Sequence, residues 1–401
     1  MKMPGIASRS AFFLIFMHSL FAFPSQEVEL VETIPEPTFW LEGNSGPWGA
    51  GNPFYEVRTP LRKKLISYLN THPSTISQLE AVFAGHIDDV KRDVASLSEA
   101  HMLRAVGTIE SEAVYAPTFA ILSTSDLKLL GPLMMRAAEA YAKNMNDHRR
   151  ELDETLAEAG LDSTYRLPVF LGFIRDKIFY EYMEQKRLFP SKDGICPKNG
   201  MGNFYGVETH EPLSSRQTYG ITHAMKGKLS FLFLYPHFRS DSLFTAWGFE
   251  HSWQAKEPFS KILRTVKRGK PTREKAILRK FRGGRTEEHA PAMLTYLVEQ
   301  RALARTERGY INTSTRLKKA TIEDLKELCA TATMHMAEFI GGQELARLFD
   351  RSAPGRNNIS VAEFREAVAW QTIWATAGFL DEEGFFPDLS ESGQELFVFE
   401  R

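Results

Sequence analysis

The sequence predicts a mainly α-helical protein with small β-hairpins, in which two diverged copies of one unit form a pseudo-dimer. Short sequence patterns recur in the same order at offsets between 197 and 199 residues. In each copy, helical spacing of apolar residues gives way to short extended pieces around a glycine and then returns to helical spacing. The 401-residue chain is long enough for two such copies and a sizeable core.

Five pairs of short patterns carry the evidence for the repeat, because five matches in one order are hard to obtain by chance. They indicate a duplication covering roughly residues 35–190 and 234–390. Residues 191–256 are expected to connect the copies, the second unit proper spans 257–390, and residues 391–401 are expected to form a tail. The pairs are Trp48-Gly49 with Trp247-Gly248, Thr59-Pro60-Leu61 with Glu257-Pro258-Phe259, His72-Pro73-Ser74-Thr75 with Lys270-Pro271-Thr272, Ser125-Asp126-Leu127-Lys128 with Glu323-Asp324-Leu325-Lys326, and Leu188-Phe189-Pro190 with Phe385-Phe386-Pro387.

The first copy predicts three short helices followed by a hairpin. Thr59 followed by Pro60 is a typical helix start, and Thr75 to Gln78 reads as a capping box for a second helix. Extended pieces are expected around Gly107, ending at Val114-Tyr115. The inward-facing residues expected on the three helices are Leu61, Leu65, Leu69, Ile76, Leu79, Val82, Ile87, Val90, Val94 and Leu97.

The second copy predicts the same order. Its first helix is expected to carry Phe259, Ile262, Leu263 and Val266. Thr272 is expected to cap a second helix that carries Ile277 and Phe281, and Gly283-Gly284 to form the turn. Thr286 is expected to open the third helix, in which Pro291 either introduces a kink or marks the true start. Leu303 to Ile311, with Gly309, is expected to form the hairpin.

Three short helices and a hairpin resemble the winged helix-turn-helix domains of bacterial ArsR- and MarR-type regulators. The resemblance covers about residues 57–120 and 257–313, and it implies DNA binding. Long helices are expected downstream over 125–146 and 321–340, with Met134, Met135, Met334 and Met336 as core residues. The run LSFLFLYPHF, residues 229–238, predicts a buried strand.

The strongest local signal is electrostatic, because the segment 261–285 has a formal charge of +10 in a chain whose net charge is −1. Such clustering suits phosphate binding and predicts double-stranded DNA as the partner. The alternative is a solvated helix face balanced by Asp381, Glu382, Glu383 and Asp388. The candidate contacts are Lys261, Arg264, Lys267, Arg268, Lys270, Arg273, Lys275, Arg279, Lys280, Arg282 and Arg285, together with Arg305 and Arg308 on the second hairpin and Lys91 and Arg92 on the first copy.

The first copy is the weaker candidate for a DNA reader. Asp88 and Asp89 open its third helix, and Glu110 and Glu112 lie on its hairpin, where they would repel phosphate. One basic copy and one neutral-to-acidic copy suggest a division of labour. The second copy would hold DNA while the first packs, dimerises or meets a protein partner.

The two cysteines, Cys196 and Cys329, exclude a disulfide framework and favour a cytoplasmic location. Residues 1–25 indicate the alternative of an exported protein, because the apolar run Ala11 to Phe23 fits a signal peptide. This segment is too short to span a bilayer. It reads alternatively as a strand of the folded protein.

No catalytic constellation, metal site or cofactor is expected. The histidines at positions 210, 223, 237 and 251 are spaced 13 to 14 residues apart, which matches no helical ligand pair. No nucleophile motif is present. We therefore expect a DNA-binding protein in transcriptional regulation and not an enzyme. The alternatives are a scaffold whose paired winged helices bind proteins, and an exported protein of another role.

Overall fold

A computed structural model of the chain describes residues 38–43, 56–57, 59–190, 204–209, 221–234, 241–249, 252–387 and 395–400. The N-terminal apolar run, Trp48 and Cys196, on which expectations were placed, lie outside these residues. The described part is mainly helical with four small sheets, as the sequence predicts. None of its helices is both long enough and apolar enough to cross a membrane.

Residues 60–117 form three helices and a two-stranded hairpin, here called the first unit. The side chain of Thr59 accepts a hydrogen bond from the Arg62 amide, and Thr75 and Gln78 form the predicted capping box. Ile87 was expected to face inward, but it is 43% exposed because the helix that it opens turns this end toward solvent. The elements are α2 (Pro60–Thr71), α3 (Ile76–Val82), η2 (Ala84–His86), α4 (Ile87–Glu99), β2 (Leu103–Ile109) and β3 (Glu112–Pro117).

Residues 256–312 repeat this order and are here called the second unit. The expected cap of the second helix is wrong, and for the third helix the structure selects the start marked by Pro291. Thr272 does not cap α11, because its hydroxyl accepts a hydrogen bond from the Lys267 amide instead. The third helix begins at Ala290 and not at Thr286, since Pro291 occupies its first turn. The elements are α10 (Lys256–Thr265), α11 (Glu274–Leu278), η6 (Arg279–Phe281), α12 (Ala290–Glu299), β8 (Leu303–Thr306) and β9 (Gly309–Asn312).

Helices that follow each unit pack together around one common apolar core, here called the helical body. Its centre is the contact of α5 with α13 and α16, which joins the two halves of the chain. Met134 and Met336 are buried there as expected, whereas Met135 and Met334 are exposed. The elements are α5 (Thr124–Asp147), α6 (Arg149–Glu158), η3 (Ser163–Tyr165), α7 (Arg166–Val169), the π-helix η4 (Phe170–Phe179), α8 (Tyr180–Gln185), α13 (Lys319–Gly341), α14 (Gln343–Phe349), α15 (Ala353–Arg356) and α16 (Val361–Glu382).

Two sheets connect the units to the helical body and have corresponding topologies. In the first sheet, β4 follows the hairpin and pairs in parallel with β5, which pairs antiparallel with β1. In the second sheet, β10 follows the hairpin and pairs in parallel with β11, which pairs antiparallel with β7. The orders are β1-β5-β4 and β10-β11-β7-β6. The expected C-terminal tail therefore contains a buried strand. The strands are β1 (Thr38–Gly43), β4 (Ile121–Leu122), β5 (Phe204–Thr209), β6 (Ile221–Lys226), β7 (Leu229–Leu234), β10 (Thr315–Arg316) and β11 (Leu396–Glu400).

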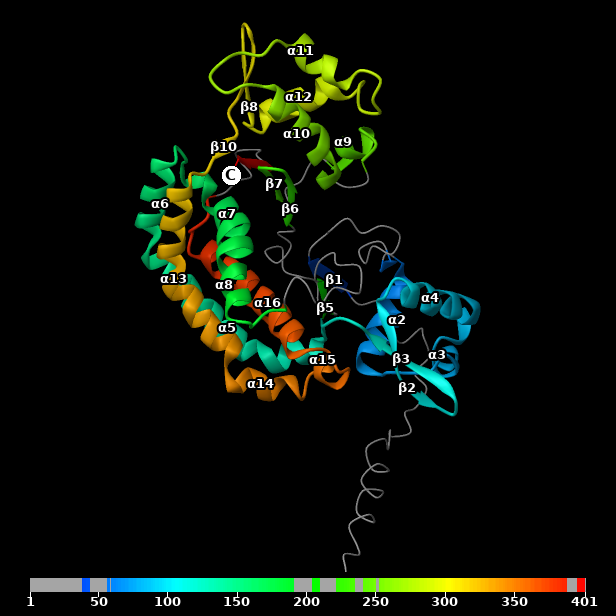
Figure 1. Cartoon of the computed structure of the whole chain (residues 1–401). Coiled ribbons are helices and arrows are strands. Elements are labelled where there is room, and N and C mark those ends of the chain that lie inside the picture. Colours follow the sequence, from blue (N-terminus) through cyan, green and yellow to red (C-terminus); the bar gives the residue numbers. More distant parts are fainter. Residues whose placement is uncertain are drawn as a thin grey trace, which may run out of the picture.

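The predicted buried strand β7 has no solvent face, because side chains alternate across a sheet and both of its faces are covered. Phe231 and Phe233 point into the core of the second unit, and Leu232 and Leu234 into the helical body. The connecting helices α9 (Asp241–Ala246) and η5 (Ser252–Ala255) lead from this sheet to the second unit. The two units thus lie at separate ends of the helical body (Figure 1).

Candidate nucleic-acid interface

Tyr310 fixes the second hairpin against the loop that precedes α11. Its backbone exchanges two hydrogen bonds with Thr272, at 2.8 and 2.9 Å, and its hydroxyl donates to Glu274 Oε2 at 3.1 Å. Burial, and next the hydrogen bond to Glu274, raise the pKa of this phenol above its usual value. Gly309 has a φ of +133°, and any β-carbon there would collide with the Thr272 carbonyl. The hairpin, the loop and α11 therefore form one connected surface.

The turn between η6 and α12 is held by its own hydrogen bond. The Gly283 amide donates to Glu287 Oε2 at 2.5 Å, and the φ of +71° at Gly283 is one that glycine adopts readily. A shallow hollow of about 390 Å³ lies beside this turn. Its lining combines three cations with two carboxylates and a leucine: Glu274, Lys275, Leu278, Arg279, Arg282 and Glu287.

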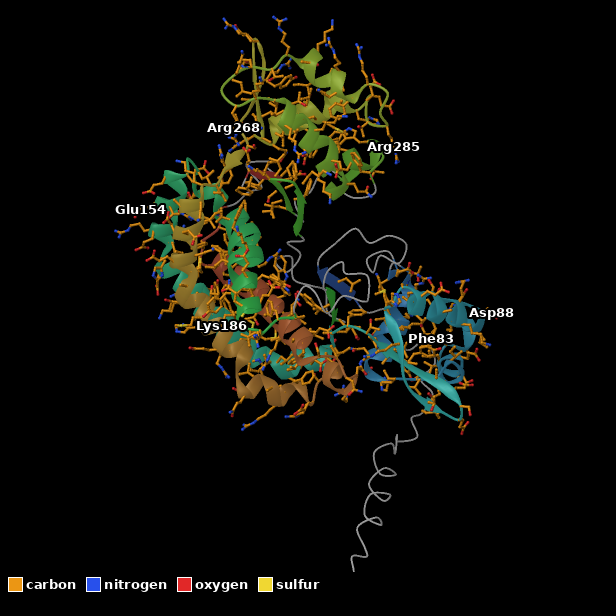
Figure 2. All side chains as sticks on the ribbon, in the orientation of Figure 1. Phe83, Asp88, Glu154, Lys186, Arg268 and Arg285 are labelled. Atoms are coloured by element: carbon orange, nitrogen blue, oxygen red, sulfur yellow. The ribbon has the colours of Figure 1, made fainter. Side chains whose placement is uncertain are left out.

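Nine of the candidate cations are exposed and form no ion pair with any described residue. They come from the loop before α11, from α11 and η6, from the following turn, and from the hairpin. Figure 2 shows nitrogen-tipped side chains extending outward from this end of the second unit, around α11 and β8. The nine are Lys267, Lys270, Arg273, Lys275, Arg279, Lys280, Arg282, Arg305 and Arg308, here called the basic surface.

The other four candidate cations of this unit contact the protein itself. Arg268 pairs with Glu400 at 2.8 Å and donates to the Ser314 carbonyl at 2.6 Å, which ties the loop to β11. The remaining three bind neighbouring elements and are therefore poor candidates for phosphate contacts. Arg264 donates to the Lys226 carbonyl, Arg285 donates to the Gly248 carbonyl, and the Lys261 ammonium lies 4.7 Å from the centre of the Phe281 ring.

The first unit has the opposite electrostatic character. Residues 59–122 contain six lysines and arginines against seven aspartates and glutamates, whereas residues 256–316 contain sixteen against six. Lys91 pairs with Glu80 at 2.7 Å, and this hydrogen-bonded carboxylate raises the pKa of the lysine. Arg92 pairs with Asp89 at 2.7 Å and lies 3.6 Å from Asp93. Both of the candidate DNA contacts in this unit already have anionic partners.

An acidic side chain on the hairpin of the first unit binds the start of α3. Glu112 accepts hydrogen bonds from the Ser77 hydroxyl at 2.5 Å and from its amide at 3.3 Å, so it closes the first turn of α3. The hydrogen bonds from Ser77 lower the pKa of Glu112. Val106, at a bulge in β2, is 38% exposed, so this unit has a second exposed apolar side chain in addition to Ile87.

The sequence shows which residues are basic but not which of them have partners, because Ser314, Glu400 and Gly248 are far from the basic segment in sequence. Of the alternative counter-charges, Asp381 and Glu382 lie at the end of α16 and Glu383 follows it, in the helical body, where Glu383 accepts a hydrogen bond from Asn146 at 2.8 Å. Asp388 lies outside the described residues. Of the four histidines considered as ligands, only His223 is described. The described residues contain no group of three or more potential metal ligands.

No family model, no curated protein and no solved structure matched this chain.

Proposed function

We propose that this protein binds double-stranded DNA through the basic surface of its second unit and acts in transcriptional regulation. The observation that carries the proposal is the set of nine exposed cations without ion-pair partners among the described residues. They come from the loop before α11, α11, η6, the turn after η6 and the hairpin. Bringing so many like charges together is electrostatically unfavourable for the protein alone, and a polyanion relieves this repulsion.

The physical basis of binding would be counterion release from the DNA. Each phosphate neutralised by a lysine or arginine contributes a slope of about −0.9 to log K against log salt. If all nine cations made such contacts, the slope would approach roughly −8. Arg268, Arg264 and Arg285 would contribute little, because their guanidinium groups hold the unit together.

We further infer that the two units are winged helices that arose by duplication, which makes the chain a pseudo-dimer. Local details that recur in both support this. The β-bridge of Ser74 with Tyr115 corresponds to that of Thr272 with Tyr310. In each unit, a residue with positive φ follows the third helix. The carbonyl of that residue accepts a hydrogen bond from the hydroxyl of a threonine that lies just after the hairpin. These pairs are His101 with Thr118, at 2.6 Å, and Arg301 with Thr313, at 2.9 Å.

A protein-binding role for the first unit is the second candidate function. The exposed Ile87 and Val106, together with the paired Lys91 and Arg92, favour it over DNA binding for this unit. In such a division the first unit recruits a protein partner while the second holds the duplex. The corresponding scaffold alternative, in which both units bind proteins only, requires that duplex DNA not bind at all.

The test is fluorescence anisotropy of the full chain with a labelled duplex at about 50–100 mM salt, where phosphate contacts dominate. The variant Arg279→Ala/Lys280→Ala/Arg282→Ala is expected to bind at least tenfold more weakly. The matched control, Lys91→Ala/Arg92→Ala, is expected to bind within twofold of wild type. Absence of binding by the wild type would contradict the proposal, and a larger loss in the control would move the interface to the first unit.

A further inference from the structure

We propose that the second unit binds B-form duplex DNA without reading its base sequence. This inference rests on the proposed function, and it narrows the ligand from double-stranded DNA in general to B-form duplexes of any sequence. Its basis is the third helix α12, which in a helix-turn-helix arrangement is the element placed in the major groove. The composition of that helix's exposed face differs from the composition that base recognition requires.

Base edges are read chiefly by Arg, Lys, Asn and Gln side chains, which form paired hydrogen bonds with guanine or adenine. The exposed positions of α12 carry none of them: they are Pro291, Ala292, Thr295 and Glu299. Thr295 is the only hydroxyl among them, and it donates within its own helix to the Pro291 carbonyl at 3.3 Å. Glu299 lies in the last turn, so the half of α12 that would enter the groove first presents small, uncharged surface.

The cations lie on the elements that precede and follow α12 in the chain instead of on α12 itself. Lys275, Arg279 and Arg282 precede the helix, and Arg305 and Arg308 follow it on the hairpin. Long cationic side chains on either side of a small, uncharged helix reach the phosphates that border a groove, and phosphate contacts position a protein without specifying sequence. Ala292 and Thr295 present methyl groups, which can contact a thymine methyl but form none of the paired hydrogen bonds that identify guanine or adenine.

The aromatic side chains of the unit distinguish a duplex from a single strand. Proteins that hold single strands stack exposed aromatic rings on the bases. All four aromatic residues in residues 256–316 are buried: Phe259, Phe281, Tyr296 and Tyr310. RNA duplexes are a poor fit as well, because their deep and narrow major groove does not admit a helix. B-form DNA remains as the matching ligand.

Selection from a randomised duplex pool, with the full chain at about 100 mM salt, tests this inference. We expect no enriched motif after several rounds and affinities within about threefold for AT-rich and GC-rich duplexes. Single-stranded DNA and an RNA duplex of equal length should compete at least fivefold more weakly. Thr295→Ala should change affinity by less than twofold, while Arg279→Ala weakens binding to every duplex alike.

An enriched motif bound tenfold or more above its scrambled form would overturn the inference and leave DNA binding intact. Equal or stronger competition by single strands or by the RNA duplex would overturn it as well. Absence of binding to any duplex would instead overturn the proposed function itself, and with it this inference. The two failures are therefore distinguishable in one set of titrations.

Discussion

Replacing Tyr310 by Phe isolates the contact that fixes the second hairpin to α11. The lost hydroxyl donates to Glu274 Oε2 at 3.1 Å from a ring that is 5% exposed. A hydrogen bond to a charged group contributes about 1.5–3 kcal/mol to the free energy of unfolding. In the variant, water can replace part of the lost interaction, because the Glu274 carboxylate is only half-buried. We therefore expect the free energy of unfolding to fall by about 1–2 kcal/mol at neutral pH.

The same substitution has a defined pH dependence. Because burial and the hydrogen bond to Glu274 raise the pKa of Tyr310, the folded protein retains the proton at a pH where the unfolded chain loses it. The stability that the phenol contributes is complete below its usual pKa of about 10 and is lost as the pH rises above it. Urea unfolding should therefore give a difference between wild type and Tyr310→Phe that is constant at neutral pH and narrows above pH ~10.

Tyr115 supplies the matched control, since it occupies the corresponding position of the first hairpin. Its hydroxyl has no hydrogen bond to a described residue, so Tyr115→Phe should change stability by less than about 0.5 kcal/mol. Equal losses of stability in Tyr310→Phe and Tyr115→Phe would refute the reasoning about Glu274. A stability difference between wild type and Tyr310→Phe that widens at alkaline pH would refute it as well.

Three further predictions concern positions in the two units and the helical body. Gly309→Ala should destabilise by about 2 kcal/mol or more in urea unfolding, because its positive φ and the nearby carbonyl leave no room; Gly107→Ala, with nothing within 4 Å, should have little effect. Burial raises the pKa of Cys329 to about 12, so in a Cys196→Ser background the thiol should react with Ellman's reagent at pH 8 only on unfolding. Asp93→Asn weakens a buried ion pair and should lower stability by about 2–3 kcal/mol without altering DNA affinity; a twofold change in affinity would contradict the separation of the units.

Local structure that depends on residues close together in the sequence could be predicted. The capping box at Thr75, the apolar stripe of α2 and the hairpin around Gly309 depend on spacing within one element, and all three are present. For the third helix of the second unit two local signals competed, and the sequence left both starts open. Thr286 is a good cap residue, but the fixed φ of Pro291 makes the later start more favourable.

Features that depend on distant residues could not be predicted. The apolar run Leu396 to Phe399 favours a strand locally, but its place in the sheet depends on pairing with β7, which joins residues more than 160 positions apart. The same limit applies to the candidate interface. The basic segment was apparent from composition, yet the separation of nine exposed cations from Arg268, Arg264 and Arg285 depends on partners brought near only by the fold.

The salt dependence of duplex binding by the wild-type chain tests the central claim most directly. The affinity for one labelled duplex of about 20–30 base pairs would be measured from roughly 50 to 300 mM potassium chloride. Nine available cations predict a linear plot of log K against log salt with a slope between about −5 and −8. A slope shallower than about −2, or no binding at the lowest salt, would contradict the assignment of the basic surface as a DNA-binding site.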